Sequence, residues 1–262
     1  MRIVIKVGTS TLAHATGRLN IRRVELLCKV ISDLKNAGNQ IVLVSSGAIG
    51  MGVGKLGLPG RPGDMPGKQA AAAVGQCELM YTYDKLFSEY SHTVAQILLT
   101  ADDIQDPRRS RHVHDSLEQL LRWNALPIIN ENDAVATDEI GIQTTIGEND
   151  SLSAVVARLV SADLLILLSD IDGLYTADPR KDPDAQLIPV VEELTPEILA
   201  LAGGAGSSLG SGGMATKLRA AGIATEAGID MIITNGEHPQ WLYDLFEGKA
   251  VGTRFIGKRD RT

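Results

Sequence analysis

The sequence predicts an α/β protein in which a mostly parallel central sheet is sandwiched between helices, a three-layer arrangement. Two observations carry this prediction. Six short apolar runs are continuous rather than alternating, as expected of strands that helices cover on both faces. Longer segments with helical periodicity separate most of these runs, and strand–helix alternation of this kind produces parallel sheets.

The predicted strands are short and almost entirely apolar. They comprise Ile3–Val7, Gln40–Val44, Val94–Leu99, Leu126–Ile129, Leu164–Leu168 and Met231–Thr234. Open parallel sheets gather their ligands at the carboxyl ends of the strands. Functional side chains are therefore expected directly after these runs.

The predicted helices have recognisable starts and ends. Asn20 is a good N-cap for a helix that ends near Gly38, with an apolar face between them. An Asp or Thr N-cap followed directly by proline starts two more helices, at 106–107 and 195–196. Three further helices are expected at 67–89, 150–160 and 214–227.

Glycine is concentrated at 47–67 and 203–213, which predicts shaped loops there. Residues 52–57 match the dinucleotide-binding pattern G-x-G-x-x-G, but that pattern needs a helix to begin at its third glycine. Leu58-Pro59-Gly60 follows instead, so we interpret the match as a coincidence within a glycine-rich loop. This opposes a nucleotide-dependent oxidoreductase. A small hairpin is predicted at 138–147.

Length, charge and cysteine content restrict the class of protein. The chain has 262 residues, of which 44% are apolar, enough for a single domain over 1–262. Its net charge is −7 without a basic stripe, which argues against a nucleic-acid partner. No stretch approaches ~20 apolar residues, so no membrane span is predicted. Cys28 and Cys77 are predicted to be buried thiols in a reducing compartment, which favours a cytoplasmic protein.

Two lysines beside glycine-rich backbone predict a phosphoryl-transfer site. Lys6 lies inside an apolar strand, where an ammonium group needs a functional reason, and Gly8 follows it. Lys217 lies one turn into a predicted helix that begins after Gly212-Gly213, and a helix N-terminus suits an anion. The P-loop pattern G-x-x-x-x-G-K-[ST] is absent, so these two segments are expected to hold the phosphates instead.

Polar residues after the strands predict a second, acid-binding part of the site. Asn130-Glu131-Asn132-Asp133 combines amide donors with carboxylates, which fits a zwitterion whose ammonium group meets Asp133. Glu148-Asn149-Asp150 repeats the theme at a helix start, where ordinary capping is compatible with ligand binding. Ser169-Asp170 and the following turn could surround a nucleoside. The five histidines show no metal-ligand spacing beside acidic residues, so metal ligands stay unassigned.

In these segments the chain resembles the amino-acid kinase family. The matching segments are Ile5–Ser10, Ser45–Ile49, Lys68-Gln69, Ala73–Gln76, Ile129–Val135, 147–150, Gly173–Pro179 and Gly212–Lys217. They run in order along nearly the whole chain, and those around Asn130 and Lys217 are the most specific. Within the family, the chain is most similar to members that phosphorylate the γ-carboxylate of L-glutamate, the first step of proline biosynthesis.

The resemblance implies L-glutamate and ATP as substrates, Mg²⁺ as cofactor, and a role for each motif. Lys6 and Lys217 would contact the transferring phosphoryl group, and Asp150 would orient both lysines. The glutamate-binding residues would be Ser46, Asp133 and Asn149, with Asn130 and Glu148 nearby. The ATP-binding residues would be Lys6, Gly8, Ser169, Asp170, Ser211, Gly212, Gly213, Met214, Ala215, Thr216 and Lys217.

The resemblance also implies the organisation of the chain. The amino-acid kinase fold would form one domain, with the acid substrate bound mainly by about 1–160 and the nucleotide mainly by about 161–257. The C-terminal PUA domain of the family's long form is expected to be absent, and a homodimer or tetramer is expected. Family members acting on acetylglutamate, aspartate or UMP, and a non-catalytic amino-acid sensor, remain alternatives. Asp133 argues against acetylglutamate, whose nitrogen is neutral, and both lysines argue against a sensor.

Overall fold

The computed structural model describes residues 1–14, 16–135, 148–203 and 213–259. Its centre is an eight-stranded sheet with the strand order β3-β4-β2-β1-β5-β7-β8-β6. The strands are β1 (Arg2–Val7), β2 (Gln40–Ser45), β3 (Val94–Leu99), β4 (Leu126–Glu131), β5 (Leu164–Ser169), β6 (Val190–Val191), β7 (Asp230–Asn235) and β8 (Thr253–Phe255). Neighbouring strands are parallel except for β7 and β8. The predicted mostly parallel α/β architecture is confirmed.

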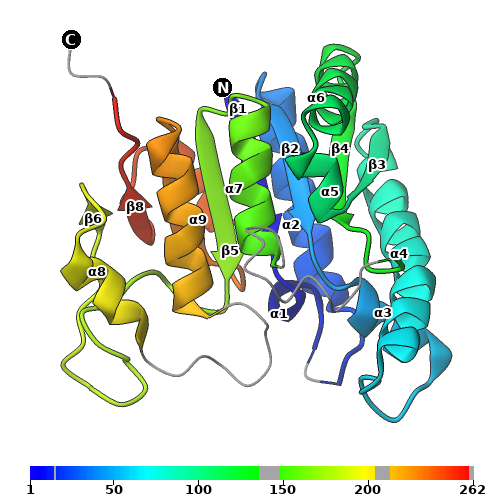
Figure 1. Cartoon of the computed structure of the whole chain (residues 1–262), viewed down its shortest axis with the longest axis horizontal. Helices are drawn as coiled ribbons and strands as arrows, with labels where there is room; N and C mark the ends of the chain where they lie inside the picture. Colours follow the sequence, from blue (N-terminus) through cyan, green and yellow to red (C-terminus); the bar gives the residue numbers. More distant parts are fainter. Residues whose placement is uncertain (15, 136–147, 204–212, 260–262) are drawn as a thin grey trace.

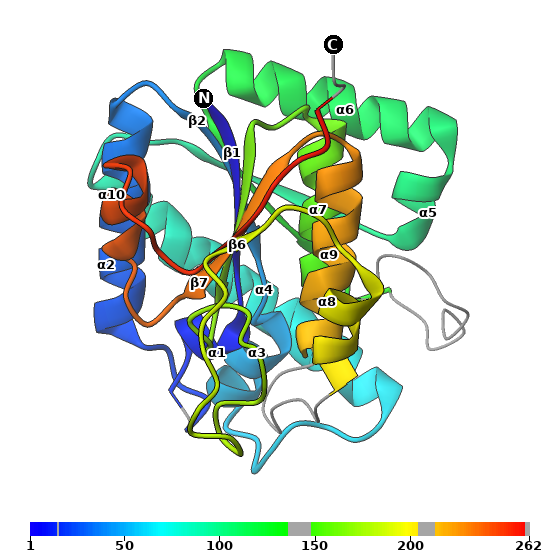
Figure 2. The same ribbon diagram turned by 90° about the vertical axis from the view of Figure 1, so that its left-hand side faces the viewer.

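Helices cover both faces of this sheet (Figures 1 and 2). One core lies between the sheet and α2 (Ile21–Asn36), α4 (Met65–Ser88) and α10 (Trp241–Phe246). The other lies under α6 (Pro107–Arg122), α7 (Asn149–Leu159) and α9 (Met214–Glu226). Successive residues of β1 alternate between them, since Ile3 and Ile5 pack in the first core and Val4 in the second.

The predicted helix starts are confirmed where a side chain caps them. The Asn20 side chain accepts a hydrogen bond from the backbone of Arg23 at the start of α2. Asp106 accepts from two backbone N–H groups at the start of α6. Thr195 accepts from Ile198 at the start of α8 (Pro196–Ala200), which leads into a 3₁₀ turn at Leu201–Gly203. The predicted hairpin at 138–147 lies outside the described residues.

The sequence prediction missed the shortest elements. The strands β6 and β8 extend the sheet at one edge, where two or three residues carry too little periodicity to be recognised. The same holds for α1 (Thr9–Leu12), α5 (Ala101–Gln105) and α10.

The glycine-rich segment after β2 is the main correction, because part of it is helical. Ala48–Leu56 forms α3, which ends at Gly57 in the left-handed conformation. A Cβ at Gly52 would lie 1.8 Å from the carbonyl oxygen of Ala71 in α4, and one at Gly75 would lie 1.7 Å from that of Ala48. Gly52 in α3 and Gly75 in α4 therefore allow these two helices to pack closely, and the interpretation of 52–57 as a loop was wrong.

The cysteine prediction was half right. Cys28 is a buried free thiol in α2, and burial raises its pKa. Cys77 is also free, but it is exposed on α4. Helical periodicity places both residues on a helix, and only the packing of α4 decides which of its sides faces solvent.

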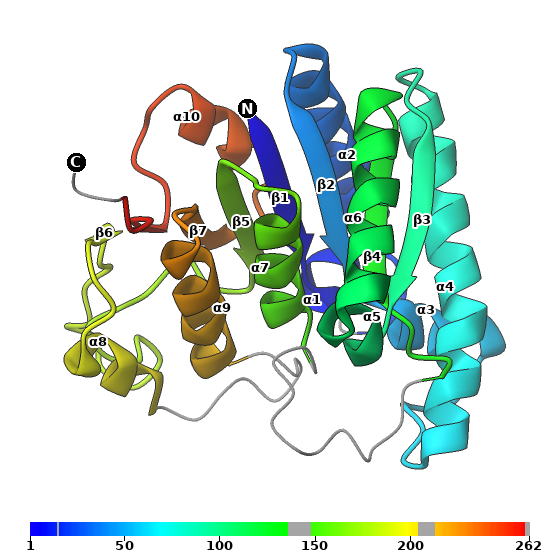
Figure 3. The ribbon, with the colours of Figure 1, turned by 45° about the horizontal axis from the view of Figure 1, so that its top comes forward.

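The carboxyl ends of the parallel strands meet along one edge of the sheet, the lower edge in Figure 1. The helices α7 and α9 lie side by side in front of the central strands, with their N-termini at that edge (Figures 1 and 3). Strand ends and helix N-termini therefore surround one region. In the part of the chain described, no helix has the length and apolarity needed to cross a bilayer.

Candidate active site

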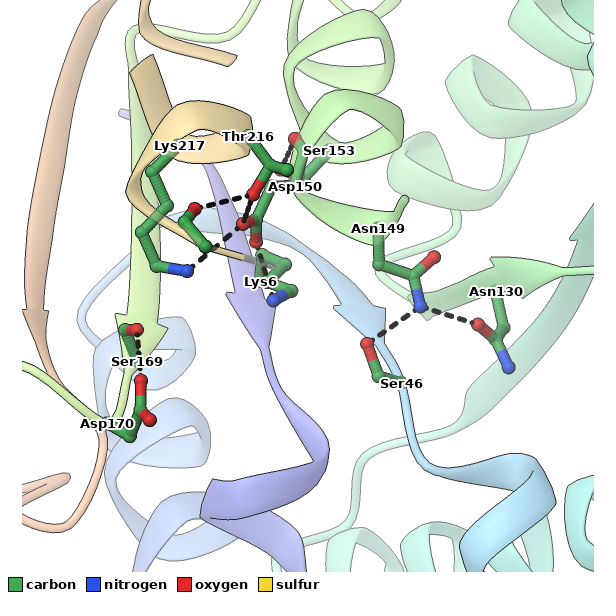
Figure 4. A network of polar contacts seen from close by, with 11 residues as sticks. Lys6, Ser46, Asn130, Asn149, Asp150, Ser153, Ser169, Asp170, Thr216 and Lys217 are labelled. Carbon is green, nitrogen blue, oxygen red and sulfur yellow. Dashed lines mark hydrogen bonds and ion pairs between the residues drawn. The ribbon is translucent and has the colours of Figure 1, made fainter. Parts of the chain in front are cut away.

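Lys6 lies near the carboxyl end of β1 and points to the face that α7 and α9 cover. It shares this face with Val4, two residues earlier, which packs in the core beneath these helices. The residue is 8% exposed. The strand therefore delivers an ammonium group to the N-terminal ends of α7 and α9 (Figure 4).

Asp150 receives this ammonium group. It is the second residue of α7 and is 1% exposed. Its Oδ1 lies 2.6 Å from Nζ of Lys6, and its Oδ2 lies 3.2 Å from Nζ of Lys217. The position in the first turn of a helix also favours a carboxylate, because the N-terminal end of the helix dipole is positive.

Two consecutive residues of α9 complete the contacts of this carboxylate. Lys217 is 4% exposed, so its charge is held away from bulk water. Thr216 donates a hydrogen bond from Oγ1 to Oδ2 of Asp150 at 2.9 Å. The first turn of α9 therefore orients the carboxylate and supplies the second cation.

This network keeps its carboxylate ionised. Burial alone would raise the pKa of Asp150, but the charges of Lys6 and Lys217, with hydrogen bonds from Lys6 and Thr216, hold that pKa at about 2. The aspartate is therefore ionised at neutral pH. Two ammonium groups meet at this carboxylate, in a position where water screens their charges weakly. The network is suited to an anion.

A chain of side-chain amides runs beside this network. Nδ2 of Asn149, the residue before Asp150, donates to Oγ of Ser46 at 2.7 Å and to Oδ1 of Asn130 at 3.0 Å. Nδ2 of Asn130 in turn donates to Oε1 of Gln76 at 3.0 Å. Figure 4 shows how this chain connects the ends of β2 and β4 to the start of α7. Gln76 extends it to helix α4.

A cavity of about 340 Å³ opens at the α4 end of this amide chain. Its polar lining comes from Gln76 on α4, from Gln96 on β3, and from Glu131, Asn132 and Asp133 at the end of β4. Burial, with the nearby charge of Asp133, raises the pKa of Glu131 to about 7. Burial also raises the pKa of Asp133, and the charge of Arg61 opposes this rise. The β4 side of the cavity is therefore acidic.

Glu148 lies at the N-cap position of α7 without capping it through its side chain. Burial and the charge of Asp150 raise its pKa, while Arg219 and Lys217 oppose the rise. It thus borders the Asp150 network, and its charge interacts with that of Lys217.

The predicted nucleotide ligands that the structure describes lie along the same strand-end edge. A Cβ at Gly8 would lie 3.5 Å from Nζ of Lys6, so glycine keeps the backbone open beside that ammonium group. Gly213 is the N-cap residue of α9. The first-turn N–H groups of α9, from Met214 and Ala215, have no acceptor within the helix and suit a phosphate.

Ser169 and Asp170 follow β5, and Oγ of Ser169 donates to Oδ1 of Asp170 at 3.1 Å. Figure 4 shows this pair apart from the Asp150 network, at the end of β5. Ser211 and Gly212, which were also predicted to bind ATP, lie outside the described residues. Among the residues described, no group of three or more His, Cys, Asp or Glu side chains could hold a metal ion.

The structure therefore places seven of the predicted site residues in two networks, which meet where Asn149 and Asp150 are neighbours in the chain. Lys6, Asp150, Thr216 and Lys217 form one, and Ser46, Asn130 and Asn149 belong to the other. Asp133 belongs to neither and lines the cavity. Gln76 had no predicted role, although it lies in a segment matching the family. A polar residue in an alanine-rich helix was the available signal, and the structure shows that it is buried.

Comparison with known proteins shows the family of the chain. The model of the amino acid kinase family matches residues 1–235, so the chain belongs to that family. It is 54% identical over 258 residues to the glutamate 5-kinase of Clostridium perfringens, covering 98% of this chain and 96% of that protein. It is 52% identical over 259 residues to the glutamate 5-kinase of Listeria innocua, covering 99% and 94%.

Solved structures support the fold. A carbamate kinase from Giardia lamblia bound to AMP-PNP aligns with a TM-score of 0.67 and 21% identity, over 98% of each chain. The UMP kinase from Bacillus anthracis aligns with a TM-score of 0.64 and 15% identity, over 98% of this chain and 96% of that one. At these identities the likeness concerns the fold alone.

Proposed function

We propose that this chain transfers the γ-phosphoryl group of ATP to the γ-carboxylate of L-glutamate, forming L-glutamate 5-phosphate in the first step of proline biosynthesis. The activity follows from relatives about 50% identical over nearly the whole chain that carry the name glutamate 5-kinase. The observation that supports the mechanism is the meeting of Lys6 and Lys217 at one buried carboxylate.

The chemistry needs positioning and charge rather than a base. The γ-carboxylate of glutamate has a pKa of about 4.3 in water, so it is already an anion at neutral pH. The barrier comes from bringing this anion to a polyanionic phosphate. Lys6 and Lys217 would stabilise the charge that spreads over the phosphoryl oxygens, and Asp150 would hold both ammonium groups in place.

The two networks suggest that ATP and glutamate bind to different parts of the site. The α9 N-terminus, Gly8 and Ser169-Asp170 would bind ATP, which assigns the nucleotide mainly to about 161–257. Ser46, Asn130, Asn149 and Asp133 would bind glutamate, with Glu148 at the border, which assigns the acid mainly to about 1–160. Asn149 and Asp150 are adjacent, so a glutamate held by the first would present its γ-carboxylate beside the second.

Mg²⁺ fits this site as a companion of ATP. Asp150 is the buried carboxylate of the network, and two lysines already occupy it. Mg²⁺ commonly keeps several waters and binds through substrate phosphates. The ion would therefore rely mainly on phosphate oxygens and neutralise their charge.

We further propose a cytoplasmic homo-oligomer, a dimer or tetramer. The exposed aromatic side chains of Tyr81 and Trp123, at 65% and 72%, offer apolar surface for subunit contacts. The free thiols of Cys28 and Cys77 suit a reducing compartment. Light scattering coupled to size-exclusion chromatography tests the oligomeric state. A monomer at micromolar concentration would contradict the proposed dimer or tetramer.

Hydroxylamine trapping tests the reaction directly. The acyl phosphate formed from glutamate reacts with hydroxylamine to give a hydroxamate, and ADP release gives a second readout. We expect both signals with L-glutamate and neither above background with N-acetylglutamate, aspartate or UMP. A protein that releases ADP with another acceptor, or forms no hydroxamate from glutamate, would contradict the proposed function.

A further inference from the structure

Only one of the two polar atoms of the Gln76 side-chain amide has a hydrogen-bond partner among the described residues. The residue is 8% exposed and lies on α4 at the wall of the cavity. Its Oε1 accepts the hydrogen bond from Asn130, while its Nε2 is buried and has no hydrogen-bond partner among the described residues. Buried amide donors are nearly always satisfied, so this one calls for an acceptor that binds from the cavity.

The amide chain fixes which atom Gln76 presents. Nδ2 of Asn149 donates to Oδ1 of Asn130, and Nδ2 of Asn130 donates to Oε1 of Gln76. Reversing the Gln76 amide would set two NH₂ groups against each other. The free donor therefore stays Nε2, and a donor of this kind prefers an anionic acceptor.

The same cavity offers the opposite preference on its β4 side. Glu131 and Asp133 line it there, and each can accept from an ammonium group. An amide donor from α4 and carboxylates from β4 together match a carboxylate and an ammonium group on one small molecule. That pair is the α-carbon end of an amino acid.

We propose that Nε2 of Gln76 binds the α-carboxylate of the amino-acid substrate, while Glu131 and Asp133 receive its α-ammonium group. The inference rests on the proposed function, because it concerns the acid that the site phosphorylates. It makes Gln76 a specificity-determining residue. The chain Gln76–Asn130–Asn149 then links recognition of the α-carbon end to the start of α7, where Asp150 holds the lysines.

The test removes the N–H donor of Gln76 by two different substitutions. Gln76→Glu keeps an oxygen for Asn130 and removes the N–H donors, and Gln76→Met removes both without adding charge. We expect KM for glutamate to rise about 10- to 100-fold in each variant, the range for one lost hydrogen bond to a charged group, with kcat and KM for ATP changing less than threefold. A lower kcat at unchanged KM for glutamate would overturn the proposal.

A substrate analogue separates recognition from structural damage. The α-amide of L-glutamate keeps the γ-carboxylate but replaces the α-carboxylate by a neutral amide. Wild-type protein should prefer glutamate in kcat/KM, and this preference should fall at least tenfold in both variants. Gln105→Glu adds the same charge at an exposed position on α5, outside the cavity lining, and its preference should stay within threefold of wild type. An equal loss of preference in Gln105→Glu would assign the effect to added charge or general damage and overturn the proposal.

Cys77 provides a binding readout that does not need turnover. Its exposed thiol lines the cavity, whereas Cys28 is buried, so a thiol reagent such as 5,5′-dithiobis(2-nitrobenzoate) should react first with Cys77. Glutamate should protect Cys77, and the half-protecting concentration should rise at least tenfold in Gln76→Met. An unchanged half-protecting concentration overturns the role of Gln76. A wild-type protein that makes no hydroxamate yet shows protection would instead contradict the proposed function.

Discussion

The ammonium nitrogen of Lys6 lies 2.6 Å from Oδ1 of Asp150, while the other oxygen of the same carboxylate faces Lys217. One buried anion thus fixes two cations that come from distant parts of the chain. Because two ammonium groups meet beside the N-terminus of α9, the network is attractive to a phosphate even though the whole protein has a net charge of −7. Local arrangement, rather than net charge, prepares this site for a polyanion.

We predict that Lys6→Ala and Lys217→Ala each lower kcat by roughly 10²–10³, the scale for one lost transition-state donor. Either change removes a cation that would stabilise the transferring phosphoryl group. Hydroxamate formation under saturating glutamate and ATP measures the effect. Lys249→Ala is the matched control, because Lys249 is an exposed lysine outside the site that pairs with Asp244. Near wild-type turnover in both variants would refute the assigned roles.

Asp150→Asn should destabilise the fold as well as reduce turnover. The variant removes the carboxylate that pairs with two largely buried ammonium groups, and breaking a buried ion pair costs about 3–5 kcal/mol. The free energy of unfolding in urea at pH 7 should fall by about this amount. A variant as stable as wild type would show that the lysines find other partners.

The contribution of Asp150 should also depend on pH. Its pKa is depressed to about 2 in the folded state, so its stabilisation is present above the unfolded pKa of about 3.9 and is lost as pH falls toward 2. The difference in unfolding free energy between wild type and Asp150→Asn should therefore shrink by about 2 kcal/mol between pH 5 and pH 2. Comparing the two proteins cancels the titration of other carboxylates. A constant difference over this interval would contradict the depressed pKa.

Glutamate binding should improve as pH rises through about 7. Burial and the charge of Asp133 raise the pKa of Glu131 to about 7, and only the ionised carboxylate attracts an ammonium group. The value of kcat/KM for glutamate, which reports ionisations of the free enzyme, should increase between pH 6 and pH 8. Glu131→Gln should lower it and flatten this part of the profile. An identical rise in Glu131→Gln would assign the ionisation to another group.

Asp133→Ala should raise KM for glutamate with a smaller effect on kcat, because it removes a partner of the α-ammonium group. Steady-state kinetics at saturating ATP measure the change. Asp102→Ala is a suitable control, since Asp102 is an exposed aspartate in α5, outside the cavity lining. If KM for glutamate is unchanged in Asp133→Ala, this residue does not belong to the site.

The sequence was sufficient for the six longer strands because each reads as an almost continuous apolar run. Five of them are buried along nearly their whole length, and the edge strand β3 is only partly buried. It was also sufficient to expect Lys6 and Lys217 at one strand-end edge. The place of Asp150 between them was implied by the family resemblance and not by the residues alone, and the hydrogen bond from Thr216 to it was not expected, because such contacts depend on how α7 and α9 pack. Gln76 escaped for the same reason, since helical periodicity gives its face but not its neighbour.

The helix α3 was missed because glycine lowers helix propensity, and tertiary packing overrides that preference here. The packing itself is testable. Gly75→Ala would place a Cβ 1.7 Å from the carbonyl oxygen of Ala48, and Gly52→Ala would place one 1.8 Å from that of Ala71. Backbone atoms cannot yield as a flexible side chain can, so α3 and α4 must separate. We expect each variant to lose about 2 kcal/mol or more in urea unfolding, in the upper part of the range for overpacking.

The matched control for Gly52→Ala and Gly75→Ala is Gly50→Ala, which lies in α3 with Gly52. A Cβ at Gly50 would lie 3.6 Å from Cγ2 of Thr9, an ordinary contact, and alanine favours a helix interior over glycine by about 0.5–1 kcal/mol. Gly50→Ala should therefore be as stable as wild type or more so. Gly75→Ala should also raise KM for glutamate, because Gly75 precedes Gln76 and Ala48 follows the Ser46 segment. Equal stabilities for the three variants would mean that α3 and α4 do not pack through their glycines.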